Sequence, residues 1–113
     1  MEQHDLDVME KLPAPRSSRV IDFESIEISP GIIPGTYFLI VSGEKPWVTM
    51  TVQLTPLIYV RQPEYWEIEV VATQAGIGLP MVAPYHAVLD ISYLRGTKGI
   101  EVVGATKRER RDV

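Results

Sequence analysis

Three residues on one face of the alternating segment Tyr85–Leu94 are of the types that form a catalytic triad: His86, Asp90 and Ser92. In a triad a base takes the proton of the serine and an acid orients the base, so all three need hydrogen-bond contact. Residues four apart on a strand are separated by about 13 Å, because each residue adds ~3.3 Å. The spacing therefore favours a solvated strand face over a catalytic site.

Glu67 and Glu69 are the second set of residues whose types and spacing could carry out a reaction. On a strand two such carboxylates lie about 6.6 Å apart, a separation that suits acid–base work on a glycosidic bond. Two glutamates at this spacing also occur on an ordinary exposed strand face, where like charges keep sheet edges from associating. His4 and His86 are the only histidines, and neither lies in a metal-binding pattern. We therefore predict no catalytic, cofactor-binding or metal site, and a protein that is not an enzyme.

Length and composition set the class of protein. A chain of 113 residues with a hydrophobic fraction of 45% fits one globular domain. The absence of cysteine excludes disulfides, thiolate metal sites and cysteine nucleophiles. The start, Met1 to Asp5, is acidic where a secretory signal is basic, and no apolar run approaches the ~20 residues of a membrane span. We expect a cytoplasmic protein without a membrane segment.

Two alternating segments, Pro46–Leu54 and Tyr65–Ala72, indicate the fold class. Their apolar members are Val48, Met50, Val52 and Leu54 in the first segment, and Trp66, Ile68, Val70 and Ala72 in the second. Successive strand side chains point to opposite faces, so a period of two gives one dry and one wet face. Both segments are rich in β-branched and aromatic residues, which suit a pleated surface. They predict an antiparallel β domain.

The rest of the chain repeats this pattern at short intervals. Val20–Ser29 predicts a strand whose alternation shifts between Phe23 and Ile26, as a β-bulge near Glu24 would cause. The expected strand Thr36–Ser42 holds the near-continuous apolar run Tyr37–Val41, which suits a central strand covered on both sides, and it forms a hairpin with Pro46–Leu54. The remaining expected strands are Leu57–Arg61 (a short strand or edge segment), Tyr85–Leu94 and Ile100–Val103. Six to seven short strands predict an all-β fold, either an antiparallel β-sandwich or a small closed β-barrel.

Charge divides the chain into three parts. Residues 1–19 form an expected mobile arm, residues 20–104 a single β domain, and residues 105–113 a charged tail. Residues 1–15 carry four acids and one base, residues 16–104 nine acids and six bases, and residues 105–113 two acids and four bases. The acidic body argues against a duplex-DNA binder, which needs a basic face.

One connection, Gln74–Pro84, contains no charged residue although it has the glycines and prolines of a loop. Its apolar side chains are Ile77, Leu79, Met81 and Val82. Such side chains either fold over the core, contact a partner or subunit, or cover a small apolar ligand. They are the main candidate interaction residues.

Two aromatic residues, Trp47 and Tyr65, fall on the otherwise polar faces of their strands. If the strands pair, the rings form a surface platform that could stack nucleic-acid bases. Glu67 and Glu69 would repel phosphate, and neither strand carries Lys or Arg, which argues against nucleic acid. Cross-strand pairing or burial of the rings is the favoured interpretation.

The leading functional hypothesis is a non-catalytic protein-interaction or assembly module that binds a protein partner or a second copy of itself. It would use the Gly76–Pro84 loop, Trp47 and the two termini. The first alternative is a β-barrel that binds a small apolar ligand in its lumen, lined by Leu39, Met50, Val52, Ile68 and Val70. The second is a single-stranded nucleic-acid binder that uses Trp47, Tyr65 and the basic tail.

Overall fold

The computed structural model describes residues 16–113. The predicted mobile arm falls on residues 1–19, and its first fifteen residues lie outside the described part. The described residues form eight strands: β1 (Arg16–Val20), β2 (Ser25–Pro30), β3 (Tyr37–Lys45), β4 (Thr51–Pro56), β5 (Tyr65–Ala75), β6 (Ala83–Asp90), β7 (Gly99–Val103) and β8 (Arg108–Asp112). The described residues form no helix, so this part of the chain has none that is long and apolar enough to cross a bilayer.

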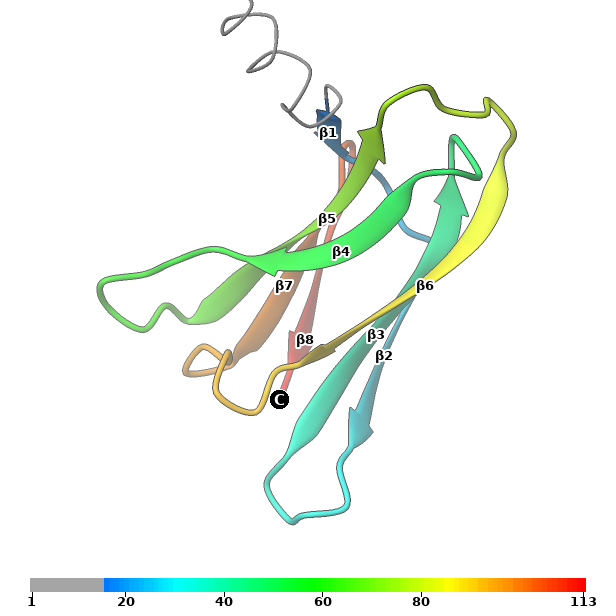
Figure 1. The fold of residues 1–113 in the computed structure, drawn as a ribbon. Helices are drawn as coiled ribbons and strands as arrows, with labels where there is room; N and C mark the ends of the chain where they lie inside the picture. Colours follow the sequence, from blue (N-terminus) through cyan, green and yellow to red (C-terminus); the bar gives the residue numbers. More distant parts are fainter. Residues whose placement is uncertain (1–15) are drawn as a thin grey trace, which may run out of the picture.

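The strands form two sheets that face each other (Figure 1). One sheet has the order β2-β3-β6 and is antiparallel throughout. In the other, β5 pairs with β4 along one edge and with β1 and β7 along the opposite edge, and β8 lies beyond β7. The predicted all-β fold is confirmed, and the two sheets form a β-sandwich, not a closed barrel.

The long strand β5 organises the second sheet. Its first half, from Tyr65 to Glu69, pairs with β7, and its last residues, from Val71 to Ala75, pair with β1. The β5–β7 pairing is parallel, while the other pairings are antiparallel. β4 pairs with β5 and not with β3, with Val52 opposite Ala72.

The core lies between the sheets and follows the predicted alternation. Its fully buried large side chains are Leu39, Val41, Ile68, Val70, Ile91, Ile100 and Val102. On β5 the buried residues Ile68, Val70 and Ala72 alternate with partly exposed ones, as a strand with one dry face requires. On β6 the buried residues Tyr85 and Ala87 do the same.

The predicted single strand Val20–Ser29 is wrong, because the chain changes sheets between β1 and β2. Ile21 N donates to Val70 O at 2.9 Å in one sheet, and Glu24 N donates to Ser42 O at 2.8 Å in the other. Ile21 and Phe23 are buried between the sheets. The shift in alternation is therefore a crossover and not a β-bulge.

Three other predicted elements are wrong. β3 forms no hairpin with β4, because β2 and β6 occupy both of its edges; it is covered on one face only, with Leu39 buried and Phe38 exposed. Leu57–Arg61 is not a strand: Leu57 N makes one more bond to Glu67 O, and the chain then leaves the sheet. The predicted charged tail contains β8, which pairs with β7.

Candidate functional site

Asp90 and Ser92 form the turn that ends β6, apart from His86. Asp90 Oδ1 accepts hydrogen bonds from Ser92 N at 2.9 Å and from Ser92 Oγ at 2.7 Å. Ser92 Oγ also accepts a bond from Tyr37 N at 3.1 Å. The bonds from Ser92 lower the pKa of Asp90. His86 is exposed and lies opposite Ser42 on β3. The three residues are therefore not assembled as a triad.

Glu67 shares a cation with Glu101 of the neighbouring strand β7. The parallel β5–β7 register places Glu67 opposite Glu101. Arg108 Nη1 lies 2.5 Å from Glu67 Oε1 and 3.0 Å from Glu101 Oε2, so it bridges the two. Arg110 Nε lies 2.7 Å from Glu101 Oε1. The guanidinium of Arg110, followed by that of Arg108, holds the pKa of Glu101 below its ordinary value. A proton donor in glycoside hydrolysis needs the opposite shift.

Trp47 and Tyr65 do not form one platform. Tyr65 is the first residue of β5, and Trp47 lies beside Gly78, beyond the last residue of that strand. Eleven strand residues span roughly 35 Å, which separates the two rings. The Tyr65 hydroxyl donates to Asp112 Oδ1 at 2.7 Å, and the Arg110 guanidinium lies 4.6 Å from the Tyr65 ring centre. Tyr65 therefore supports β8.

The four predicted interaction residues of the β5–β6 loop are all exposed. The exposed fraction is 100% for Ile77, 49% for Leu79, 58% for Met81 and 65% for Val82. These exposed fractions show that the loop is not folded over the core. The loop itself lies at one end of the sandwich (Figure 1). We call residues 76–82 the apolar loop.

Residues of the β3–β4 connection and of β5 hold the backbone of the apolar loop in position. Leu79 N donates to Thr49 Oγ1 at 2.9 Å, and that hydroxyl donates to Gln74 Oε1 at 2.7 Å. A β-carbon at position 78 would lie 2.2 Å from Trp47 Cε3, so glycine is needed where the loop passes over the indole. Trp47 is half-buried and supports the loop.

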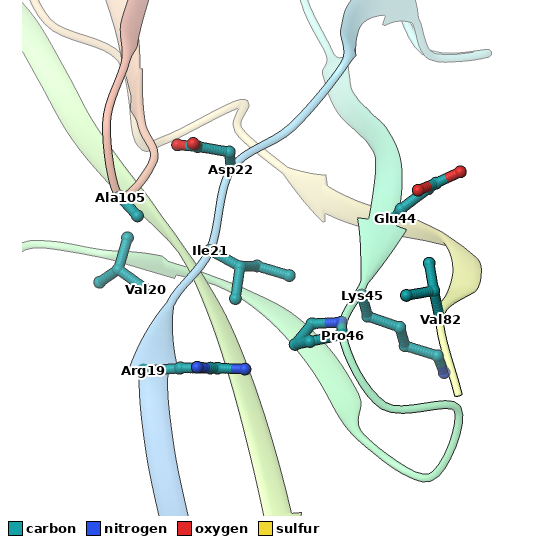
Figure 2. Close-up of a pocket in the computed structure, with 9 residues that line it drawn as sticks. All are labelled: Arg19, Val20, Ile21, Asp22, Glu44, Lys45, Pro46, Val82 and Ala105. Atoms are coloured by element: carbon teal, nitrogen blue, oxygen red, sulfur yellow. The ribbon is translucent and has the colours of Figure 1, made fainter. Parts of the chain in front are cut away.

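A shallow hollow of about 340 Å³ adjoins the loop (Figure 2). Its lining residues are Arg19, Val20, Ile21, Asp22, Glu44, Lys45, Pro46, Val82 and Ala105. Two of its charged groups are engaged: Lys45 Nζ donates to Met50 O at 2.9 Å, and Asp22 Oδ1 accepts from Thr106 N at 2.8 Å. The hollow carries both signs of charge, and Val82 links it to the apolar loop.

Sequence reasoning did not find the residues that fix the loop or the hollow beside it. Thr49 looked like an ordinary polar strand residue, although its hydroxyl joins the loop to Gln74. Gly78 was the available signal, since a glycine between two apolar residues often marks a close backbone approach. Arg19 reaches the hollow because of the crossover between the sheets, which the sequence pattern did not indicate.

Other exposed apolar side chains lie at the opposite end of the sandwich. Ile32 and Ile33 occupy the β2–β3 turn, and Ile58 and Val60 occupy the β4–β5 loop. Antiparallel pairing of β4 with β5 places the β4–β5 loop at the end of β5 far from the apolar loop. These side chains provide matched controls for experiments on the apolar loop.

Among residues 16–113, no three histidine, aspartate or glutamate side chains gather closely enough to hold a metal ion. Comparison of the chain with models of protein families found no match, and no curated protein or solved structure matches it significantly.

Proposed function

We propose that this protein is a non-catalytic interaction or assembly module that binds another protein surface through the apolar loop. One observation carries the proposal: an uncharged loop exposes Ile77, Leu79, Met81 and Val82 together. Soluble monomers seldom leave contiguous apolar side chains in water, and such patches mark contact surfaces. The loop is also held in place by Thr49 and Trp47, so little order has to be gained on binding.

The geometry gives less support to the two alternatives. Of the residues expected to line a barrel lumen, Leu39, Met50, Ile68 and Val70 belong to the buried core cluster. The stacking platform needed for single-stranded nucleic acid is divided, because Trp47 lies beyond one end of β5 and Tyr65 begins the other. An assembly module needs neither a lumen nor a platform.

The test compares two double substitutions in the full chain. Leu79→Ser with Met81→Ser removes apolar area from the proposed contact, whereas Ile58→Ser with Val60→Ser removes it from the opposite end. Light scattering on size-separated protein, over about a hundredfold range of concentration, measures association. We expect the wild type and the Ile58/Val60 variant to associate, and the Leu79/Met81 variant to associate at least tenfold more weakly.

Folding must be equal in the three proteins for this comparison to hold. All four substituted side chains are exposed, so each variant should retain the unfolding midpoint of the wild type within a small margin. Equal association of the Leu79/Met81 variant and the wild type would overturn the proposal. A wild type that stays monomeric and binds no protein partner would also overturn it.

A further inference from the structure

The strand β8 leaves one edge of its sheet open. Among residues 16–113 it pairs with β7 alone, and the order of the sheet ends there. Just outside the ladder, and in the same register, Gly104 N donates to Lys107 O at 2.8 Å and Val113 N donates to Lys98 O at 3.0 Å. Backbone groups of an antiparallel strand alternate between its two sides. The odd-numbered residues of β8 therefore bond to β7.

The even-numbered residues of β8, namely Arg108, Arg110 and Asp112, direct their backbone N–H and C=O groups to the open edge. A second strand can bond there only if it presents its own free residues opposite these three. Two copies of β8 can meet this condition when they run antiparallel about a two-fold axis. The parity of the free residues allows that axis at residue 109, 110 or 111.

Charge selects one of these three registers. With the axis at residue 110, Arg108 lies opposite Asp112 of the second copy, and Glu109 lies opposite Arg111. Each of these two pairs occurs twice, so four of the five facing positions join opposite charges. With the axis at residue 109 or 111, Glu109 or Arg111 faces its own copy. Opposite charges across a ladder stabilise the pairing and like charges destabilise it, which favours the axis at residue 110.

The one like pair in this register, Arg110 with Arg110 of the second copy, is compensated within each molecule. Arg110 Nε lies 2.7 Å from Glu101 Oε1, and its guanidinium carbon lies 4.6 Å from the ring centre of Tyr65. Both partners belong to β7 and β5, away from the open edge. Arg108 is shared in the same way between Glu67 and Glu101. The cations on this face are therefore largely neutralised before a second copy arrives.

Glu109 and Arg111 lie on the other face of β8 and supply most of the charge match. Their neighbours on β7 are Val102 and Ile100, so that strand places no competing charge beside them. Arg111 Nη2 lies 3.2 Å from Glu109 Oε1 of its own strand, and the two side chains are 39% and 42% exposed. Arg111 Nη1 also donates to Arg110 O at 3.0 Å, a bond that a backbone N–H of the second copy would replace.

We propose that β8 pairs with β8 of a second copy of this chain, antiparallel and about a two-fold axis at Arg110, so that two sheets join into one. Glu109 of each copy faces Arg111 of the other and sets the register. This contact is separate from the apolar loop and does not rest on the proposed function. An edge of five residues held by exposed charges gives a weak dimer that salt dissociates.

Reversal of single charges tests the pairing. The parent protein is the full chain with Leu79→Ser and Met81→Ser, so that the apolar loop contributes little to association. We expect it to dimerise in sedimentation experiments at low salt, and Glu109→Arg or Arg111→Glu to weaken the dimer at least tenfold. An equimolar mixture of these two variants should dimerise like the parent, because all the pairs of Glu109 and Arg111 positions then join opposite charges again.

Three results would overturn the inference: a monomeric parent, single variants that dimerise like the parent, or a mixture no better than its components. Raising the salt concentration from about 0.05 to about 0.5 M should weaken the parent dimer, and an unchanged dimer would also overturn it. The exposed Glu109–Arg111 pair contributes little to folding, so the urea midpoints of the variants should match that of the parent.

Disulfide formation tests the register without relying on charge, since the chain contains no cysteine. Facing residues have α-carbons about 5.5 Å apart, within reach of a disulfide. Position 108 of one copy lies four residues, about 13 Å, along the strand from position 108 of the other. In the same parent, a mixture of Arg108→Cys with Asp112→Cys should therefore cross-link at least tenfold faster than either variant alone. Equal rates would overturn the proposed register.

The edge and the apolar loop can fail independently. If the charge and cysteine tests fail while Leu79→Ser with Met81→Ser still weakens association of the wild type, the inference is wrong and the proposed function stands. If the loop substitutions leave association unchanged while Glu109→Arg and Arg111→Glu abolish it singly and restore it together, the proposed function is wrong and the inference stands.

Discussion

Glu101 and Arg110 face each other across the β7–β8 ladder, with Arg110 Nε 2.7 Å from Glu101 Oε1. Arg108 completes the cluster by contacting Glu101 and Glu67. The side chains of β8, Arg-Glu-Arg-Arg-Asp, include no apolar residue. Ion pairs and the backbone ladder therefore hold this edge strand in the sheet, while apolar packing contributes little.

Replacement of Glu101 by glutamine tests this account of β8. The side chain is only 10% exposed, so removing its charge weakens two charge-assisted hydrogen bonds in a poorly hydrated place. We expect the free energy of unfolding to fall by about 1–2 kcal/mol, as measured by urea denaturation. Glu109→Gln is the control, since the exposed Glu109–Arg111 pair is worth less than about 1 kcal/mol. Equal losses in both variants would contradict the account.

The lowered pKa of Glu101 predicts how the free energy of unfolding changes at acid pH. The folded-state pKa of Glu101 lies below its ordinary value of 4.5 because Arg110 and Arg108 stabilise the ionised form. Its contribution is therefore complete above the unfolded-state pKa and is lost as pH falls through the folded-state pKa. The difference in free energy of unfolding between the wild type and Glu101→Gln should be largest near neutral pH and shrink below about pH 4. A difference independent of pH would contradict this.

Tyr85 predicts a loss of stability in alkali. Its buried hydroxyl donates to Asp22 O at 2.9 Å, and burial raises the pKa of Tyr85 from 10.0 to about 12. This contribution is complete below pH 10 and is lost as pH rises through 12. Tyr85→Phe should remove a late step from the ultraviolet titration of tyrosinate. At neutral pH it should also lower the free energy of unfolding by about 1 kcal/mol through the lost hydrogen bond. An unchanged late step in the variant would refute the assignment.

Substitutions at a buried and at an exposed isoleucine distinguish effects on stability from effects on association. Ile68 is fully buried and Ile77 is fully exposed. Ile68→Ala should lower the free energy of unfolding by about 2–5 kcal/mol through lost burial and a cavity. Ile77→Ala should change it by less than about 0.5 kcal/mol while weakening association. Equilibrium denaturation and light scattering measure the two effects, and a large loss of stability in Ile77→Ala would mean that the loop packs on the core.

Gly78 tests whether the position of the apolar loop matters as well as its composition. An alanine there would place its β-carbon 2.2 Å from Trp47 Cε3 and 2.8 Å from Gln74 Oε1, so the loop must shift. We expect Gly78→Ala to weaken association several-fold although every apolar side chain of the loop remains. Unchanged association would show that the loop binds without being fixed on Trp47.

Period-two alternation predicted β5 and most of β6, because each has one face on the core and one in water. Of the predicted strand Pro46–Leu54, only Thr51–Leu54 belongs to β4, and the residues before Thr51 form the β3–β4 connection. Met50 and Leu54 are buried as the pattern required, and so are Ile68 and Val70 on β5. The exposed apolar loop was also identified from sequence, because it combines loop residues with an absence of charge. The sequence did not indicate whether the loop covers the core or is exposed, because its position depends on contacts with Thr49 and Trp47, which are distant in the chain.

Long-range pairing explains the features that the sequence did not reveal. The crossover at Ile21 and Phe23 has the alternation of a bulged strand, and only hydrogen bonds to Val70 and Ser42 distinguish the two. β8 has the composition of a solvated tail, because its partners Glu67 and Glu101 lie on other strands. Strand composition alone does not identify a partner that is distant in the chain.

The division of one β5 edge between β1 and β7 also determines the order in which the protein can fold during synthesis. Ala75, the partner of Arg16, is made 59 residues after it (75 − 16 = 59). The other half of that edge waits for β7, and the sheet is complete only when β8 leaves the ribosome. Pairings this distant close slowly and leave strand edges open meanwhile. A nascent chain of this protein therefore cannot complete the sheet that contains β1 until β7 and β8 have both been made.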